Sequence, residues 1–247
     1  MAKSHNGRGM EKVVIIINAD VSDRGQLISA SPVTQKMVEA LQQSIAADSA
    51  DRTIEIVSAA TLWSKSSRII KKDRGTSDTI YCPLTIQIPD YFDFAQCQIF
   101  SACKDINARR RWVEKKLGFK TSVGDSWLGH MWLPIIMTDK PMFGEVIGEG
   151  SMPNSYEHPV LIPQRQRKSL HNLARELLNS LDATPATYLL QFSLYNGEIV
   201  FDRLWPFPAA PALITLKTQQ PDLFTCHWRC LTDRKVSKLG ISDAMPI

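Results

Sequence analysis

The dipeptide Asn196-Gly197 constrains the fold most, because it lies between two apolar segments of alternating pattern. Asn-Gly is the preferred pair for a two-residue type I′ turn, since both of its central residues need a positive φ. The flanking residues 188–194 and 199–204 therefore predict the two strands of a β-hairpin. In the register of that turn Phe192 faces Phe201, so we expect one face of the hairpin to pack on a core.

Two further patterns surround this hairpin in the sequence. Before it, apolar residues recur at the spacing i, i+3, i+4, i+7, i+8 and i+11, which predicts an amphipathic helix over residues 168–181. Near the N-terminus, a β-branched run at 13–17, a helix start at Ser31-Pro32 and an alternating segment at 53–57 follow one another. This order predicts a β–α–β unit, which favours a parallel sheet.

These patterns predict an α/β (or α+β) protein with a β–α–β N-terminal unit and a mixed sheet that includes the C-terminal helix and hairpin. A helix over 105–117 is expected, capped by Asp105 and closed by Gly118, and a last strand over 224–231. We expect a flexible tail over 1–11, an α/β part over 12–150, a loop or joint over 151–165, a helix-plus-hairpin part over 166–232 and a tail over 233–247. Whether the joint separates two domains is left open.

Composition narrows the class of protein. A net charge of +4 permits an acidic partner without requiring one. No apolar run approaches the roughly 20 residues of a membrane span, and no secretory signal is evident. The five cysteines are irregularly spaced, so we expect a cytoplasmic protein without a disulfide framework. The oligomeric state is left open.

Two basic clusters are candidate binding sites for an anion or a nucleic acid. Each has a plainer interpretation, namely a solvated helix face for the first cluster and loop charges for the second. Arginines beside an aromatic ring such as Trp112 bind phosphates and stack on bases, and a helix N-terminus with cations is an anion site in principle. The clusters are Arg109, Arg110, Arg111, Lys115 and Lys116 in one helix, and Arg165, Arg167 and Lys168 at the start of another.

Metal and nucleophile motifs are weak. Cys226, His227 and Cys230 supply zinc-ligand types, but a closed zinc site needs four ligands, so no metal is assigned. On the expected strand the two cysteines share a face and suit a core. Cys103 and His130 are the right types for a Cys–His site, with Asp125 or Asp139 to orient the histidine, although no local signature supports it. Phosphate-loop, dinucleotide and zinc-protease motifs are missing from the sequence, and no cofactor is assigned.

The order of elements resembles that of ATP-grasp ligases. Residues 13–41 resemble the N-terminal strand, loop and helix of that family, and residues 170–206 resemble its late helix and hairpin. Residues 105–121, which end Leu117-Gly118-Phe119-Lys120-Thr121, are similar to its approach to the ATP domain. The family's hairpin ends in a metal-binding Glu-x-Asn, whereas this one ends Phe201-Asp202-Arg203-Leu204-Trp205. No catalytic residue is therefore carried over.

Three functional hypotheses follow. The first is a non-catalytic binding or assembly protein that contacts an anionic or protein partner through its basic helices and the Trp205–Phe207 segment. The second is an RNA-binding protein, which requires the two basic clusters to converge on one face. The third is an ATP-grasp-like ligase or another enzyme with a degenerate signature. It requires a deep pocket lined by carboxylates and a lysine, for which the candidates are Asp202, Glu145, Glu149 and Lys140.

Overall fold

A computed structural model describes residues 12–22, 24–48, 52–63, 79–124 and 129–242. The predicted tail at 1–11 and the candidate residue Asp125 lie outside these ranges. The chain divides into two compact units, Met1–Ala95 and Gln96–Ile247, which we call unit 1 and unit 2. The predicted joint at 151–165 lies inside unit 2, where it contributes strand β10 (Tyr156–Val160).

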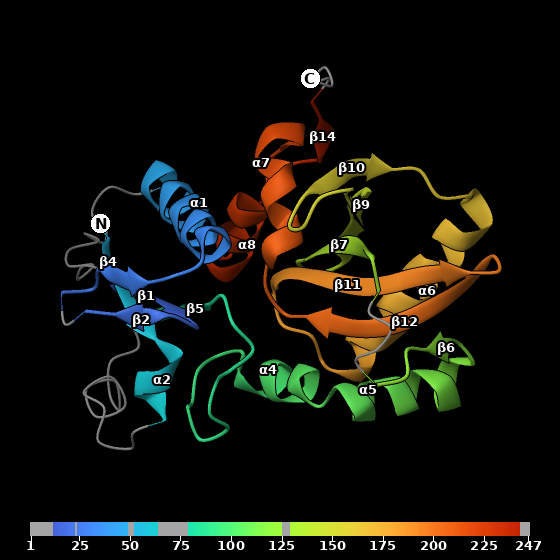
Figure 1. The fold of residues 1–247 in the computed structure, drawn as a ribbon, viewed down its shortest axis with the longest axis horizontal. Helices are drawn as coiled ribbons and strands as arrows, with labels where there is room; N and C mark the ends of the chain where they lie inside the picture. Colours follow the sequence, from blue (N-terminus) through green and yellow to red (C-terminus); the bar gives the residue numbers. More distant parts are fainter. Residues whose placement is uncertain (1–11, 23, 49–51, 64–78, 125–128, 243–247) are drawn as a thin grey trace, which may run out of the picture. The chain divides into compact units, whose positions relative to one another are not determined.

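Unit 1 contains a three-stranded parallel sheet. Strand β1 (Lys12–Ile17) lies between β4 (Thr53–Ser58) and β5 (Thr79–Pro83), and Val13–Ile17 are fully buried. Helix α1 (Pro32–Asp48) connects β1 to β4 and buries the face that carries Met37, Leu41 and Ile45 (Figure 1). Three short elements are also present among the described residues of unit 1: β2 (Asp20–Val21), β3 (Leu27–Ser29) and α2 (Ala59–Leu62). The predicted β–α–β unit is confirmed.

Unit 2 is built on a larger mixed sheet with the order β10-β9-β7-β11-β12-β6, in which β8 also pairs with β7. The predicted hairpin forms its centre: β11 (Ala186–Tyr195) and β12 (Glu198–Trp205) turn at Asn196 and Gly197, whose φ angles are 52° and 77°. Phe192 pairs with Phe201, as the turn predicts. The other strands are β6 (Lys120–Thr121), β7 (Met131–Met137), β8 (Pro141–Phe143) and β9 (Val146–Glu149).

Helix α6 (Gln164–Ser180) is the predicted leucine helix, and it starts four residues earlier than expected. Its buried face carries Leu170, Leu173, Ala174, Leu177 and Leu178. The predicted helix over 105–117 is present as α5 (Ile106–Trp112) and a π-helical turn η1 (Val113–Leu117), preceded by α4 (Cys97–Lys104). The carboxylate of Asp105 caps α5, and Gly118 ends the turn at a φ of 71°.

The last strand that the sequence predicts over 224–231 is instead helix α8 (Leu223–Leu231). The reason is a cap: Oδ1 of Asp222 accepts hydrogen bonds from the backbone N–H groups of Phe224 and Thr225, which starts a helix. Helix α8 packs on β7 and β11. Between the hairpin and α8 lie η2 (Ala210–Ile214), α7 (Thr215–Thr218) and β13 (Gln219–Gln220), which pairs with β14 (Gly240–Ile241). Among the described residues, no helix is both long and apolar enough to cross a membrane.

Candidate ligand site beside helix α6

A pocket of about 520 Å³ in unit 2 is lined by residues of the hairpin turn, strand β6, the end of η1 and the start of α6. Figure 1 shows the hairpin turn and β6 on the right-hand side of the view. Pockets that bind small molecules commonly measure roughly 300–1,000 Å³, so this one has the volume to hold a small ligand. Its polar lining consists of Lys120, Arg165, Gln166, Ser169, Asn196 and Glu198.

The start of helix α6 has an unusual distribution of charge. Its N-cap residue, Pro163, provides no side-chain acceptor for the first backbone N–H groups, and the first turn contains no acidic residue. Arg165 and Arg167 lie in that turn, where each cation opposes the helix dipole at a cost of about 0.3–1 kcal/mol. A bound anion at this helix start accepts from the N–H groups and neutralises Arg165, whereas Arg167 is already paired with Glu145.

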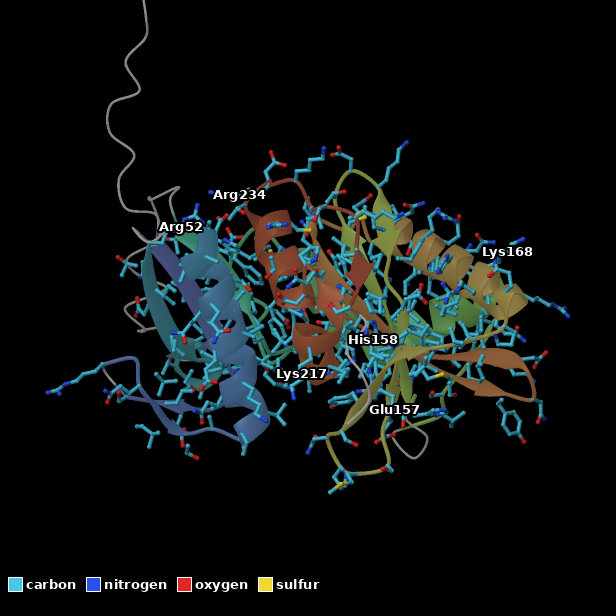
Figure 2. The ribbon with its side chains drawn as sticks, turned by 90° about the horizontal axis from the view of Figure 1, so that it is seen from above. Arg52, Glu157, His158, Lys168, Lys217 and Arg234 are labelled. Atoms are coloured by element: carbon cyan, nitrogen blue, oxygen red, sulfur yellow. The ribbon has the colours of Figure 1, made fainter. Side chains whose placement is uncertain are left out.

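The three cations predicted at this helix start point to different places. Arg165 lines the pocket, is exposed, and makes no side-chain hydrogen bond or ion pair with another described residue. Arg167 forms a bidentate pair with Glu145, at 3.0 Å between Nη1 and Oε1, and this pair lowers the pKa of Glu145. Lys168 is exposed on the outer side of α6 (Figure 2). Of the three, only Arg165 therefore lines this pocket.

Lys120 supplies the second cation of the pocket. Its Nζ lies 2.5 Å from Oε2 of Glu198, across the parallel pairing of β6 with β12, and this hydrogen bond raises the pKa of Lys120. Both side chains are about 60% exposed, so the pair contributes little to stability. An incoming anion can therefore compete with Glu198 for Lys120 at low cost.

Gln166 joins the helix start to the hairpin turn. Its Nε2 donates to the carbonyl oxygen of Gly197 at 3.0 Å, while its buried Oε1 has no donor among the described residues. Asn196 and Gly197 occupy the positive-φ positions of the turn and line the same pocket. The turn that the sequence predicts most clearly is thus one wall of the candidate site.

One member of the first basic cluster, Arg110, is buried rather than exposed at the surface. Its Nε donates to the backbone carbonyl of Asp202 at 3.0 Å, its Nη2 to Oδ1 of Asp202 at 2.6 Å, and its Nη1 to the carbonyl of Gly124 at 2.9 Å. Only 5% of the residue is exposed. Arg110 therefore belongs to the interior, and no local sequence pattern indicates this, because its partner lies 92 positions away.

The neighbours of Arg110 are more accessible. Arg111, Lys115 and Lys116 are exposed, while Arg109 is half-buried and its Nε has no acceptor among the described residues. None of these four side chains lines the pocket. The structure therefore does not bring them to the cavity that Arg165 faces.

Strand β12 contains a β-bulge at Asp202. Gln191 pairs with Arg203 and Phe192 with Phe201, so Asp202 is the extra residue between them. A bulge redirects its side chain, and here the carboxylate is fully buried. Its Oδ1 accepts from Arg110 and, at 3.0 Å, from Nε of Arg203, and its Oδ2 accepts from the N–H of Gly129 at 2.5 Å.

The same network includes Gln191, which faces Arg203 across the hairpin. Nε2 of Gln191 donates to the carbonyl of Gly129 at 2.6 Å, and its Oε1 accepts from Nε1 of Trp205 at 2.9 Å. Phe207 is 3% exposed and stacks on Phe100, with 5.9 Å between ring centroids. Trp205 is half-buried. Both rings of the predicted contact segment thus have partners within unit 2.

The cysteine and histidine motif at 226–230 lies on helix α8 and faces inward. Nδ1 of His227 accepts from the backbone N–H of Thr187 at 3.1 Å, and burial lowers the pKa of His227 to about 3. Burial also raises the pKa values of Cys226 and Cys230, so both remain thiols. Cys103, the predicted nucleophile, is likewise buried, with its pKa raised to about 12. These residues are interior packing groups rather than nucleophiles.

The carboxylates proposed for an enzyme do not converge on the pocket. Glu145 is engaged by Arg167, Asp202 is enclosed by its donors, and Glu149 and Lys140 are exposed elsewhere. The described ranges contain no group of three or more His, Cys, Asp or Glu residues placed to hold a metal ion. The residues that form the base of this hairpin therefore do not fit the divalent metal that the ATP-grasp resemblance implies.

Comparison with known proteins identifies the fold. No family model matches the sequence, and no curated protein matches it significantly. Solved structures do match. N5-carboxyaminoimidazole ribonucleotide synthetase from Thermus thermophilus has a TM-score of 0.66 at 10% identity, over 91% of this chain and 79% of that one. The Thermotoga maritima enzyme of the same name scores 0.63 at 12% identity, over 92% and 77%.

A third structure carries a nucleotide. Carboxyaminoimidazole ribonucleotide synthase from Aspergillus clavatus, solved in complex with ATP, has a TM-score of 0.65 at 8% identity, over 92% of this chain and 78% of that one. These neighbours are ligases, so the hypotheses of a non-catalytic binding or assembly protein and of an RNA-binding protein are wrong. At these identities the likeness shows the fold alone: the chain shares the α/β fold of these synthetases.

Proposed function

We propose that this protein is an ATP-grasp-type ligase, and that it binds the phosphate groups of a nucleotide or sugar phosphate in the pocket beside α6. The observation that carries the proposal is the uncapped, cation-bearing start of α6 at a cavity of about 520 Å³. The fold supports the ligase class, because the structures it resembles are synthetases, including one in complex with ADP and 5-aminoimidazole ribonucleotide.

The residues of the pocket have distinct roles in this proposal. The guanidinium of Arg165 offers paired N–H donors that match two oxygens of a phosphate, and Lys120 adds a compact positive charge. The first N–H groups of α6 donate to the same anion. Gln166 holds the hairpin turn against the helix through Gly197, so it positions the opposite wall.

We also propose a cytoplasmic location for this function. Cys82, Cys103, Cys226 and Cys230 are free and buried, which suits a reducing compartment where ATP is available.

The proposal is tested by measuring ADP formation from ATP, with 5-aminoimidazole ribonucleotide as trial co-substrate, in wild type and Arg165→Ala. We expect wild-type turnover above the ATP-only background, and a rise in KM for the phosphate compound in the variant. Lys168→Ala is the matched control, since Lys168 lies on the same helix outside the pocket. Equal kinetics of the Arg165 and Lys168 variants would count against the assigned site.

A second measurement uses binding alone. The temperature of thermal unfolding should rise as ATP, ADP or ribose 5-phosphate saturates the protein. The free energy of unfolding rises by RT ln(1 + [L]/Kd) for each ligand. The shift should shrink in Arg165→Ala and remain in Lys168→Ala. No shift with any of the three compounds at about 100-fold the working protein concentration would contradict the proposal.

A further inference from the structure

The pocket beside α6 contains an ion pair that an incoming phosphate has to open. Nζ of Lys120 lies 2.5 Å from Oε2 of Glu198, and both residues line the pocket together with Arg165. A phosphate that binds Arg165 and Lys120 takes the place of the Glu198 carboxylate at Lys120. Binding is therefore an exchange of partners, in which Lys120 gains a phosphate and Glu198 loses its cation.

The displaced carboxylate then determines which phosphates bind well. The side chain of Glu198 is 59% exposed, so water hydrates it once Lys120 has left. Its negative charge nevertheless remains in the pocket with the phosphate, and like charges a few ångströms apart repel each other even in water. A ligand offsets this repulsion if it brings hydrogen-bond donors to Glu198, because hydrogen bonds to an ionised acceptor are the stronger kind.

The remaining lining suits a ligand that carries such donors on a compact carbon body. Phe119 is half-buried beside Lys120, Ile199 is 5% exposed beside Glu198, and both line the pocket. A volume of about 520 Å³ leaves room for more than a phosphate group. A sugar ring has C–H groups that pack on apolar side chains and hydroxyl groups that donate to a carboxylate, as the ribose of a dinucleotide donates to an acidic residue.

We propose that Glu198 selects phosphate esters whose body carries free hydroxyl groups, such as a sugar phosphate or the ribose of a nucleotide, over phosphates that lack them. This selection rests on the proposed function, because it requires Arg165 and Lys120 to bind the phosphate. The hydroxyl groups replace Lys120 as the donors to Glu198. Removal of the carboxylate therefore has opposite effects on two kinds of ligand, since a phosphate without hydroxyl groups loses only a repulsion.

Calorimetry with two esters of equal charge tests this selection on the full chain. Ribose 5-phosphate carries free hydroxyl groups and methyl phosphate carries none, while at about pH 8 each phosphate is almost fully ionised. We expect wild type to bind ribose 5-phosphate about tenfold more tightly than methyl phosphate. In Glu198→Ala the Kd of methyl phosphate should fall by about threefold and that of ribose 5-phosphate should rise, so that the two values become nearly equal.

Glu176→Ala is the matched control, because Glu176 is an exposed carboxylate of α6 outside the pocket and its loss changes the net charge equally. It should leave the ratio of the two Kd values as in wild type. Equal binding of the two esters by wild type, or an unchanged ratio in Glu198→Ala, would overturn the selection and leave the phosphate site standing. Binding of neither ester by wild type would overturn the proposed phosphate site, and the selection with it.

AMP separates the two sources of this chemistry, since it carries ribose hydroxyl groups on a nucleotide. Tighter binding of AMP than of ribose 5-phosphate, with a similar loss in Glu198→Ala, supports selection of a nucleotide. Equal binding of the two compounds, with the same loss, supports selection of a sugar phosphate. A gain of affinity for both compounds in Glu198→Ala would mean that the carboxylate only repels phosphates, and it would overturn the selection.

Discussion

Replacing Arg110 by Met should destabilise the protein strongly, because it leaves the carboxylate of Asp202 buried with one cation fewer. Removing one partner of a buried ion pair typically costs about 3–5 kcal/mol. Asp202 keeps its bonds to Arg203 and Gly129, so we expect about 3 kcal/mol, at the low end of that range. Out of a total stability of about 5–15 kcal/mol, this loss is large and easily measured.

Equilibrium unfolding in urea, followed by far-UV circular dichroism, measures this loss. Arg111→Met is the matched control, because Arg111 is the adjacent, exposed arginine and its replacement should change stability by less than about 0.5 kcal/mol. The double variant Arg110→Met/Asp202→Asn should lose less than the sum of the two single variants, with a coupling energy of about 1–3 kcal/mol. A loss below about 1 kcal/mol in Arg110→Met, or additive single variants, would refute the buried network as we describe it.

Three further predictions concern other residues of unit 2. The pKa of His227 is about 3 in the folded protein, below its ordinary 6.5, so the buried neutral ring contributes its full stability above about pH 6.5, and the free energy of unfolding falls by up to about 1.4 kcal/mol per pH unit below that. In urea unfolding from pH 7 to 4, the free energy of unfolding should fall less steeply in His227→Gln than in wild type. Equal falls in the two proteins would be inconsistent with burial of a neutral ring. Gly129→Ala should unfold at clearly lower temperature, because a Cβ there would lie 2.7 Å from the carbonyl oxygen of Phe192, and an unchanged melting temperature in calorimetry would argue against this contact. Glu145→Gln should cost less than about 1 kcal/mol in urea, since both members of its pair with Arg167 are partly exposed; a loss of several kcal/mol would mean that the pair is far more buried than we find.

The elements that sequence reasoning predicts well are those specified by local chemistry. The Asn196-Gly197 turn, the leucine face of α6 and the buried run of β1 each depend on neighbouring residues, and each is found where the pattern indicates. Helix α8 differs from the predicted strand because its short apolar segment fits both the helical and the strand period. The residue that decides for a helix is Asp222, which caps its first turn.

The candidate site was harder to predict, because it depends on tertiary contacts. Arg110 and Asp202 are far apart in sequence, and no local pattern distinguishes a buried arginine from the exposed Arg111 beside it. Arg165 is the predicted cation that does line the pocket, and the signal for it was its place at a helix start. No sequence pattern indicates that Lys120 lies beside the hairpin, where the pairing of β6 with β12 places it.

The binding of ATP to Arg165→Ala, measured by calorimetry in metal-free buffer beside wild type and Lys168→Ala, tests the central claim most directly. Loss of a bidentate, charge-assisted contact of about 1.5–3 kcal/mol should weaken binding by roughly 10- to 100-fold in Arg165→Ala. In Lys168→Ala the Kd should change by less than about threefold, because that side chain lies outside the pocket. Wild-type affinity in Arg165→Ala would show that the phosphates bind elsewhere and would contradict the site beside α6.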